Sequence, residues 1–233
     1  MSWDRTTEAS GQANAPRLTP VAPTSLRETA YRSLCAAFNT GQFAPGDTLT
    51  LQMLADQLGI SLTPVREAVR RLVAEGALID TPSRTLIVPT FDRQRMEDLK
   101  SARLALEALV LERAMAQSSA DWLDALEATL EAPDAVGNTA PDLRQNHDFH
   151  FTLYRRAGSK VLLPMVQALW LQYGTLLNLI MKHPQVARIA DHRFHYEIIA
   201  ALRRGDRDGA RDALSKDIER SFRVLAPDPP PSA

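Results

Sequence analysis

The sequence predicts a mainly α-helical protein in two parts, the first with a small β-hairpin and the second an all-α bundle of about six helices. Apolar residues recur at helical spacing through most of the chain. Runs rich in β-branched residues occur only between Gly76 and Pro89. Both ends are rich in proline and small polar residues without periodicity, which is typical of flexible tails. The predicted divisions are a tail over 1–23, domains over 24–90 and 91–225, and a tail over 226–233.

The first helix is predicted to run to about Thr40. Thr24-Ser25-Leu-Arg-Glu28 resembles a capping box at its start, and Pro45-Gly46-Asp47 forms a turn-rich break after it. A second helix is expected over about 51–58, with Gly59 as its C-terminal cap.

The third helix follows directly. Ser61 and Thr63 can cap it, and Pro64 suits its first turn because its missing N–H would be unpaired there. Two short β-rich runs around Thr81-Pro-Ser-Arg-Thr85 then predict a hairpin. Two helices joined by a turn and followed by a hairpin indicate a winged helix-turn-helix, which places its second helix in the DNA major groove.

The second domain shows only helical periodicity. The breaks that separate its helices are rich in proline, glycine and small polar residues. The predicted helices cover about 92–117, 119–131, 140–157, 160–182, 185–204 and 206–224.

Composition narrows the class of protein. The single cysteine, Cys35, cannot form an internal disulfide and lies in an apolar helical pattern, so we expect a buried thiol and a cytoplasmic protein. No run of eighteen apolar residues predicts a membrane span, and the N-terminus has no signal-peptide pattern. Residues 1–90 hold eight arginines, no lysine and eight acidic residues. DNA affinity would therefore depend on a few well-placed arginines and on two copies acting together.

A set of motifs runs through both predicted domains. They are Gly46-Asp47-x-Leu49, Leu54-Ala55, Leu58-Gly59-Ile60-Ser61, Thr63-Pro64-Val65-Arg66-Glu67-Ala68, Leu72, Glu75-Gly76, Asp98-Leu99, Arg103, Glu107, Phe149-His150, His195, Ile198, Ala201-Leu202, Gly205-Asp206 and Ala210. These motifs resemble the GntR family of bacterial regulators, and those of the second domain resemble the helical FCD-type domain of its FadR subfamily.

This resemblance implies a homodimeric transcription regulator on palindromic double-stranded DNA, with a helical domain that responds to a small carboxylate effector. We expect the regulator to be a repressor. We also expect no enzymatic activity, since no nucleophile motif or dedicated general base is present; the alternative is a metal-dependent hydrolase or other metalloenzyme with an accessory DNA-binding domain.

The resemblance also implies which residues contact DNA. Arg66 lies in the first turn of the third helix, where a guanidinium can pair with guanine, although it could instead pair with Glu67 or Glu75. Arg71 is expected to be plain surface. Related regulators commonly carry arginine at the position of Leu62, and a Gly-Arg-Gly wing where this chain has Ser-Arg-Thr. The candidate DNA-binding residues are Gln52, Ser61, Leu62, Thr63, Arg66, Arg70 and Arg84.

All five histidines lie between residues 147 and 195. Members of the resembled subfamily often hold a divalent metal on one aspartate and three histidines, and the motifs place Asn146 at that aspartate and Asp217 at the third histidine. The candidate ligands are Asn146, His150, His195 and Asp217. Two imidazoles and a carboxylate can bind Zn, Ni, Mn or Fe. His147 and His192 could substitute, and a metal-free effector pocket or plain core histidines remain alternatives.

The effector pocket rests on the resemblance as well. Arg103 is four residues before Glu107, so the two could form a surface ion pair, but the resemblance implies that Arg103 points into the bundle and binds an effector carboxylate. Tyr154, one turn beyond His150, could add a hydroxyl to the same cavity. The candidate effector-binding residues are Arg103, Tyr154 and His192. The helix that starts after Phe91 would carry the signal to the winged helix-turn-helix of residues 24–90, which we call the reader.

Overall fold

The computed structural model describes residues 26–83, 85–131, 142–184 and 191–225. The first domain contains three helices and a small antiparallel sheet of strand order β1-β3-β2. Thr48 pairs with Ile87, and Ile79 pairs with the same Ile87 from the other side, so β3 is the central strand. The elements are α1 (Leu26–Asn39), β1 (Thr48–Leu49), α2 (Leu51–Leu58), α3 (Leu62–Ala74), β2 (Ile79–Asp80) and β3 (Leu86–Ile87).

This arrangement confirms the winged helix-turn-helix. Gly59 ends α2 in the left-handed conformation, with φ of 65°, and its N–H bonds back to the helix, as its sequence position predicted. Strand β1 was not predicted, because Gly46-Asp47 reads as a turn and only the pairing with β3 makes the next two residues a strand. The proposed capping box at Thr24-Ser25 lies outside the described residues.

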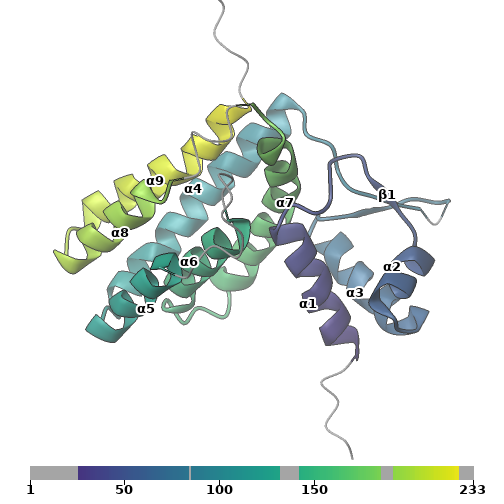
Figure 1. Cartoon of the computed structure of the whole chain (residues 1–233), viewed down its shortest axis with the longest axis horizontal. Helices are drawn as coiled ribbons and strands as arrows, with labels where there is room; N and C mark the ends of the chain where they lie inside the picture. The colour runs from purple at the N-terminus through teal and green to yellow at the C-terminus, as the bar shows by residue number, and fades with distance from the viewer. Residues whose placement is uncertain (1–25, 84, 132–141, 185–190, 226–233) are drawn as a thin grey trace, which may run out of the picture.

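The second domain is the predicted helical bundle, with six helices among the described residues. Helix α9 packs against α8 and α4, α4 also packs against α7, and α5 packs against α6 (Figure 1). The helices are α4 (Arg93–Met115), α5 (Ala120–Glu131), α6 (Leu143–Arg155), α7 (Leu162–Met181), α8 (Arg193–Arg203) and α9 (Arg207–Val224). Among the described residues, no helix is long and apolar enough to cross a membrane.

Two predicted helices differ from the structure near their starts. Helix α6 begins at Leu143, because the Asp142 carboxylate accepts hydrogen bonds from the backbone N–H groups of Arg144 and Gln145 and so caps the helix. Helix α8 begins at Arg193, directly after His192, so the single helix predicted over 185–204 does not run unbroken to its end.

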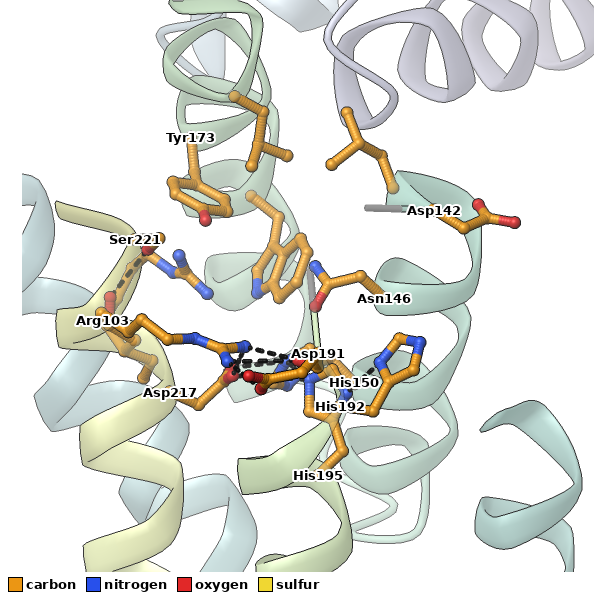
Figure 2. Close-up of a pocket in the computed structure, with 15 residues that line it drawn as sticks. Arg103, Asp142, Asn146, His150, Tyr173, Asp191, His192, His195, Asp217 and Ser221 are labelled. Carbon is orange, nitrogen blue, oxygen red and sulfur yellow. Dashed lines mark hydrogen bonds and ion pairs between the residues drawn. The ribbon is translucent and has the colours of Figure 1, made fainter. Parts of the chain in front are cut away.

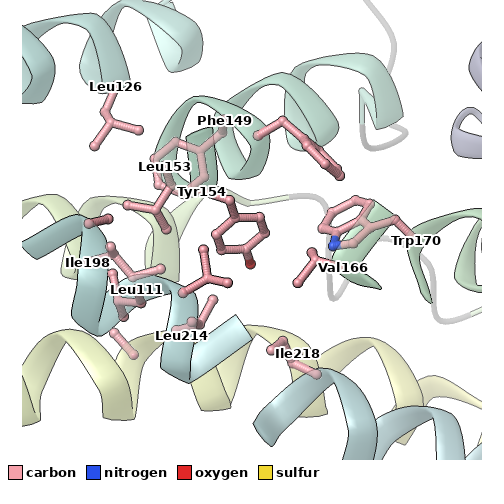
Figure 3. Packing of buried hydrophobic residues seen from close by; sticks show 14 of the residues in the cluster. Leu111, Leu126, Phe149, Leu153, Tyr154, Val166, Trp170, Ile198, Leu214 and Ile218 are labelled. Atoms are coloured by element: carbon pink, nitrogen blue, oxygen red, sulfur yellow. The ribbon is translucent and has the colours of Figure 1, made fainter. Parts of the chain in front are cut away.

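The bundle core is a continuous set of aliphatic and aromatic side chains from all six helices (Figure 3). Trp170 and Tyr154 are among its largest fully buried members. The first domain has its own core, yet Leu171 of α7 belongs to that core although it lies in the bundle's sequence. Helix α7 therefore contributes to both cores.

Helix α7 also forms most of the described polar junction between the domains, lying beside α1 (Figure 1). The Gln172 amide donates to the Glu75 carbonyl at 3.1 Å and accepts from Arg95 at 3.0 Å. The Asn178 amide donates to the Gly41 carbonyl at 2.6 Å. At Gly174, an added Cβ would lie 2.0 Å from the Phe38 carbonyl oxygen, so only glycine permits this approach.

Candidate DNA-reading surface and effector site

The candidate DNA-reading surface is the exposed side of α3. Leu62, Arg66 and Arg70 are spaced four residues apart and are all exposed, so they share one side of the helix. Val65 and Leu72, on the opposite side, are fully buried in the core of the domain. The inward stripe therefore fixes α3 so that its arginines face solvent.

The predicted contacts on this surface have individual partners. Arg70 pairs with Glu67 at 2.7 Å, but both side chains are largely exposed, so the pair is worth only about 0–1 kcal/mol and a phosphate can replace it. The Gln52 amide donates to Asp56 at 2.7 Å on the exposed side of α2. The guanidinium of Arg66 is not in an ion pair with Glu67 or Glu75 among the described contacts.

Three predictions for the reader change, gain detail or lie beyond the structure. Ser61 is the residue before α3, but its side chain makes no capping hydrogen bond, and Thr63 lies inside the first turn. Arg71 is exposed, as expected of a surface residue, and its guanidinium also lies 3.6 Å from the centre of the Tyr31 ring and pairs with Glu75 at 3.1 Å. Arg84 lies outside the described residues.

A cavity lies between helices α4, α6, α7, α8 and α9, and most of the predicted metal- and effector-binding residues line it (Figure 2). Its volume is about 40 Å³, which is room for roughly three water molecules, and it is partly open to solvent. A ligand of more than a few atoms would extend into this opening or need the helices to shift. The lining residues are Arg103, Asp142, Leu143, Asn146, His150, Trp170, Tyr173, Leu177, Asp191, His192, His195, Asp217, Ile218, Arg220 and Ser221.

Three of the four predicted metal ligands converge in this cavity. The Nε2 atom of His150 lies 3.1 Å from an Asp217 carboxylate oxygen and 3.2 Å from the Nε2 atom of His195. His195 Nε2 lies 3.6 Å from the other Asp217 oxygen. Asn146 lines the same cavity one turn before His150 on α6 (Figure 2).

Two of these three separations fit a divalent metal, and the third, 3.6 Å between His195 and Asp217, is slightly longer. Ligand atoms held at about 2.1 Å from one ion, at tetrahedral or octahedral angles, lie roughly 3.0–3.4 Å apart. The three donors are two imidazole nitrogens and a carboxylate, a set that transition metals accept readily. They are almost fully buried, at 1% exposed for each histidine and 8% for the aspartate. His150, His195 and Asp217 would therefore hold the ion, with Asn146 beside it.

Burial and neighbouring groups favour the unprotonated forms of His150 and Asp217. Burial lowers the pKa of the His150 imidazole below its usual value, which favours the neutral ring that binds metals. Burial alone would raise the pKa of the Asp217 carboxyl, but the neighbouring His195 and His150 hold that pKa well below its usual range. Asp217 also accepts a hydrogen bond from Arg220 at 3.1 Å.

Arg103 lies in the interior of the bundle, as the resemblance implied, and also pairs with Glu107. Its Nε donates to the Glu107 carboxylate at 2.6 Å, while the guanidinium lies 3.9 Å from the centre of the Tyr173 ring and 4.6 Å from that of Trp170. Burial would lower the Arg103 pKa, but the Glu107 carboxylate outweighs it and raises that pKa. The Nη1 atom is buried and has no hydrogen-bond partner among the described residues. A buried donor without a partner is costly, so this atom points to a ligand.

Of the other predicted site residues, one lines the cavity and two do not. His192 lines the cavity and lies 3.0 Å from His195, through the Nδ1 atoms of both rings. Tyr154 was wrongly placed in the cavity wall; its hydroxyl donates to Glu107 and meets the far nitrogen of His150 instead. His147 does not line the cavity, since it bonds to Asn39 of the first domain and stacks on Phe151.

Sequence reasoning missed several lining residues. Arg220 is three residues after Asp217 on α9, and this spacing was a usable signal for a pair on one helix face. Asp191 accepts from Arg220 at 2.7 Å and lies just before α8. Trp170 and Tyr173 gave no signal, because nothing in their local sequence distinguishes a cavity wall from ordinary core.

Comparisons with known proteins match a family model to each part of the chain. The model of bacterial regulatory proteins of the gntR family matches residues 26–86, and the FCD domain model matches residues 98–220. The chain is 30% identical over 190 residues to the HTH-type transcriptional regulator McbR of Escherichia coli (strain K12), covering 79% of this chain and 86% of that one.

Another relative is the HTH-type transcriptional repressor GlaR of the same organism, 29% identical over 147 residues, 60% of this chain and 67% of GlaR. The solved structure titled E. coli McbR/YncC superimposes with a TM-score of 0.76 at 27% identity, covering 86% of this chain and 97% of that one.

Proposed function

The chain belongs to the GntR family of DNA-binding transcription regulators and carries the FCD effector domain, and from that premise we propose what this domain senses and how it acts. It binds a small carboxylate in the cavity beside a divalent metal held by His150, His195 and Asp217. The observation that carries the proposal is that these three donors converge in the same buried cavity as Arg103, whose Nη1 atom has no partner among the described residues.

Arg103 would make the cavity select for ligands that carry a carboxylate. Arg103 offers an unpaired buried N–H, and a carboxylate oxygen that accepts from it makes a charge-assisted hydrogen bond. The bound metal would supply a second positive centre for the same anion. Trp170, Tyr173 and Leu177 form an apolar wall that favours a short carbon chain over a bulky polar ligand.

We propose that helix α7 couples the cavity to the reader, together with α4. One side of α7 presents Trp170 and Tyr173 to the cavity, and the other inserts Leu171 into the reader core. A ligand larger than the cavity would displace this wall and thereby move α1 against α7. Such coupling is typically about 1–3 kcal/mol and is reciprocal, so DNA must weaken the ligand as much as the ligand weakens DNA.

On DNA, we propose that the protein acts as a homodimer on a palindrome and represses transcription. The neutral charge balance of residues 1–90 supports two readers acting together, since one reader supplies few cations. A similar protein, GlaR, is named a transcriptional repressor.

Metal and effector binding can be tested in one titration. Purified protein is stripped with a chelator, reloaded with Zn²⁺ or Ni²⁺, and mixed with labelled DNA from its own promoter and a panel of short carboxylates. We expect one metal ion per chain, and one or more carboxylates that change DNA affinity about 5–150-fold. The His150→Ala/His195→Ala variant should lose the metal, and His183→Ala, outside the cavity, serves as the matched control. Metal-independent, carboxylate-independent DNA binding would contradict the proposal.

Arg66→Ala is expected to weaken specific operator binding by about 10–100-fold, because a guanidinium in the first turn of α3 can read a guanine. Arg32→Ala is the control, since Arg32 is an exposed arginine of α1 in the same domain. Fluorescence anisotropy with operator and scrambled DNA would measure both. Equal operator affinities for the two variants would exclude Arg66 from the interface.

A further inference from the structure

We infer that Gln145 with His192, and Glu107 with Tyr154, are positioning residues that turn the Nε2 lone pairs of His195 and His150 onto one point beside Asp217. The inference rests on the proposed metal site and extends it from the ligands to the residues that orient them. A neutral imidazole carries one proton on either nitrogen, and the partner of the far nitrogen decides which.

The first hydrogen-bond chain begins at a backbone carbonyl. The Gln145 amide nitrogen donates to the Leu130 carbonyl at 3.0 Å, and a carbonyl oxygen can only accept, which fixes the orientation of the amide. The Gln145 oxygen then lies 2.7 Å from His192 Nε2, so that nitrogen carries the proton. In the neutral ring His192 Nδ1 is an acceptor, and it lies 3.0 Å from His195 Nδ1. His195 therefore donates through Nδ1 and keeps its Nε2 lone pair for the cavity.

The second chain begins at a buried carboxylate. Both carboxylate oxygens of Glu107 accept hydrogen bonds from Arg103, and one of them also accepts the hydrogen bond that the Tyr154 hydroxyl donates. With that proton committed, the Tyr154 oxygen can only accept, and His150 Nδ1 lies 3.0 Å from it. His150 therefore donates through Nδ1, and its Nε2 lone pair also faces Asp217.

Both chains lead to the same point. Two nitrogen lone pairs and a carboxylate, separated by 3.1 Å, 3.2 Å and 3.6 Å, repel one another unless a cation lies among them. Arg220 reaches only the Asp217 side of this group. Gln145 and Tyr154 lie on α6 with His150, His192 directly precedes the helix α8 that carries His195, and only Glu107 comes from a helix without a donor, α4. This arrangement orients three ligands toward one metal ion, although Asn146 occupies the position where the resembled family has a carboxylate.

The test uses Co²⁺ and Zn²⁺ as probes on the full-length protein. Competition with a chromophoric chelator should give an affinity about 10–100-fold lower for Tyr154→Phe and for Gln145→Leu. Tyr196→Phe, an exposed tyrosine of α8, is the matched control and should bind as wild type does. Far-UV circular dichroism and operator binding check that each variant is folded.

Proton NMR of the Co²⁺-loaded wild-type protein reports the tautomers without any substitution. Metal bound through Nε2 of both rings should give two strongly shifted, solvent-exchangeable N–H signals, one of which changes in Tyr154→Phe. Unchanged affinities in the variants, or no exchangeable signals, would overturn the inference while the metal site stood. Failure of the wild-type protein to take up either ion would instead overturn the proposed site, and the inference with it.

Discussion

Replacement of Arg103 by methionine is expected to lower the free energy of unfolding by about 3–5 kcal/mol. Methionine keeps the length of the side chain and its contact with Trp170 and Tyr173, but it removes the charge that Glu107 needs. Glu107 is 0% exposed and would keep only the hydrogen bond from Tyr154. Breaking one side of a buried pair leaves an uncompensated charge in a low-dielectric interior, and this is the origin of the large effect.

Two comparisons isolate this cause. The double variant Arg103→Met/Glu107→Gln removes both charges and should recover most of the lost stability, because a neutral amide can still accept from Tyr154. Arg113→Met, at an exposed position of the same helix, should change stability by no more than about 0.5 kcal/mol. Urea unfolding followed by circular dichroism measures all three. A double variant as unstable as Arg103→Met would show that packing, and not charge, is responsible.

Gly174→Ala is expected to destabilise the protein by about 3 kcal/mol and to separate the reader from the bundle. Alanine is the better helix former, so local propensity alone predicts a gain of about 0.5–1 kcal/mol. The close packing turns this expected gain in stability into a loss, because the new Cβ would lie 2.0 Å from the Phe38 carbonyl oxygen and 2.5 Å from the carbonyl carbon. Both are backbone atoms, which cannot rotate aside.

The same substitution tests the coupling. If α7 transmits the state of the cavity, Gly174→Ala should abolish the change in operator affinity that an effector causes, while metal uptake by the bundle persists. Met165→Ala, at an exposed position of α7, is the control and should preserve both properties. Increased stability with intact effector response would contradict the close packing of α7 on α1.

Helix positions were largely predictable because burial imposes a 3.6-residue period that the sequence displays directly. The pairing of β1 was not predictable, since two residues carry no period and their partner is almost forty positions away. The contact of Arg71 with the Tyr31 ring was not predicted for a similar reason. Its place on Tyr31 depends on how α3 meets α1, which no local pattern encodes.

In the candidate site, too, the residues in sequence motifs could be predicted, whereas contacts that depend on how the helices pack could not. His150, His195 and Asp217 were predicted from motif resemblance, and the fold brings them together. Spacing put Tyr154 on the same helix face as His150, but it could not say that the hydroxyl would turn to Glu107 on α4. The cavity wall of α7 was invisible, because a side chain that lines a cavity and one that fills a core have the same composition.

Leu171 has a consequence for engineering with this protein. Because α7 supplies part of the reader's core, residues 26–90 alone would expose an apolar surface that the bundle normally covers. A chimera that joins this reader to another sensor must therefore keep the α7 surface that carries Leu171, Gln172 and Gly174. The unit that can be exchanged between regulators extends beyond the sequence boundary near residue 90 and includes one side of a helix from the neighbouring domain.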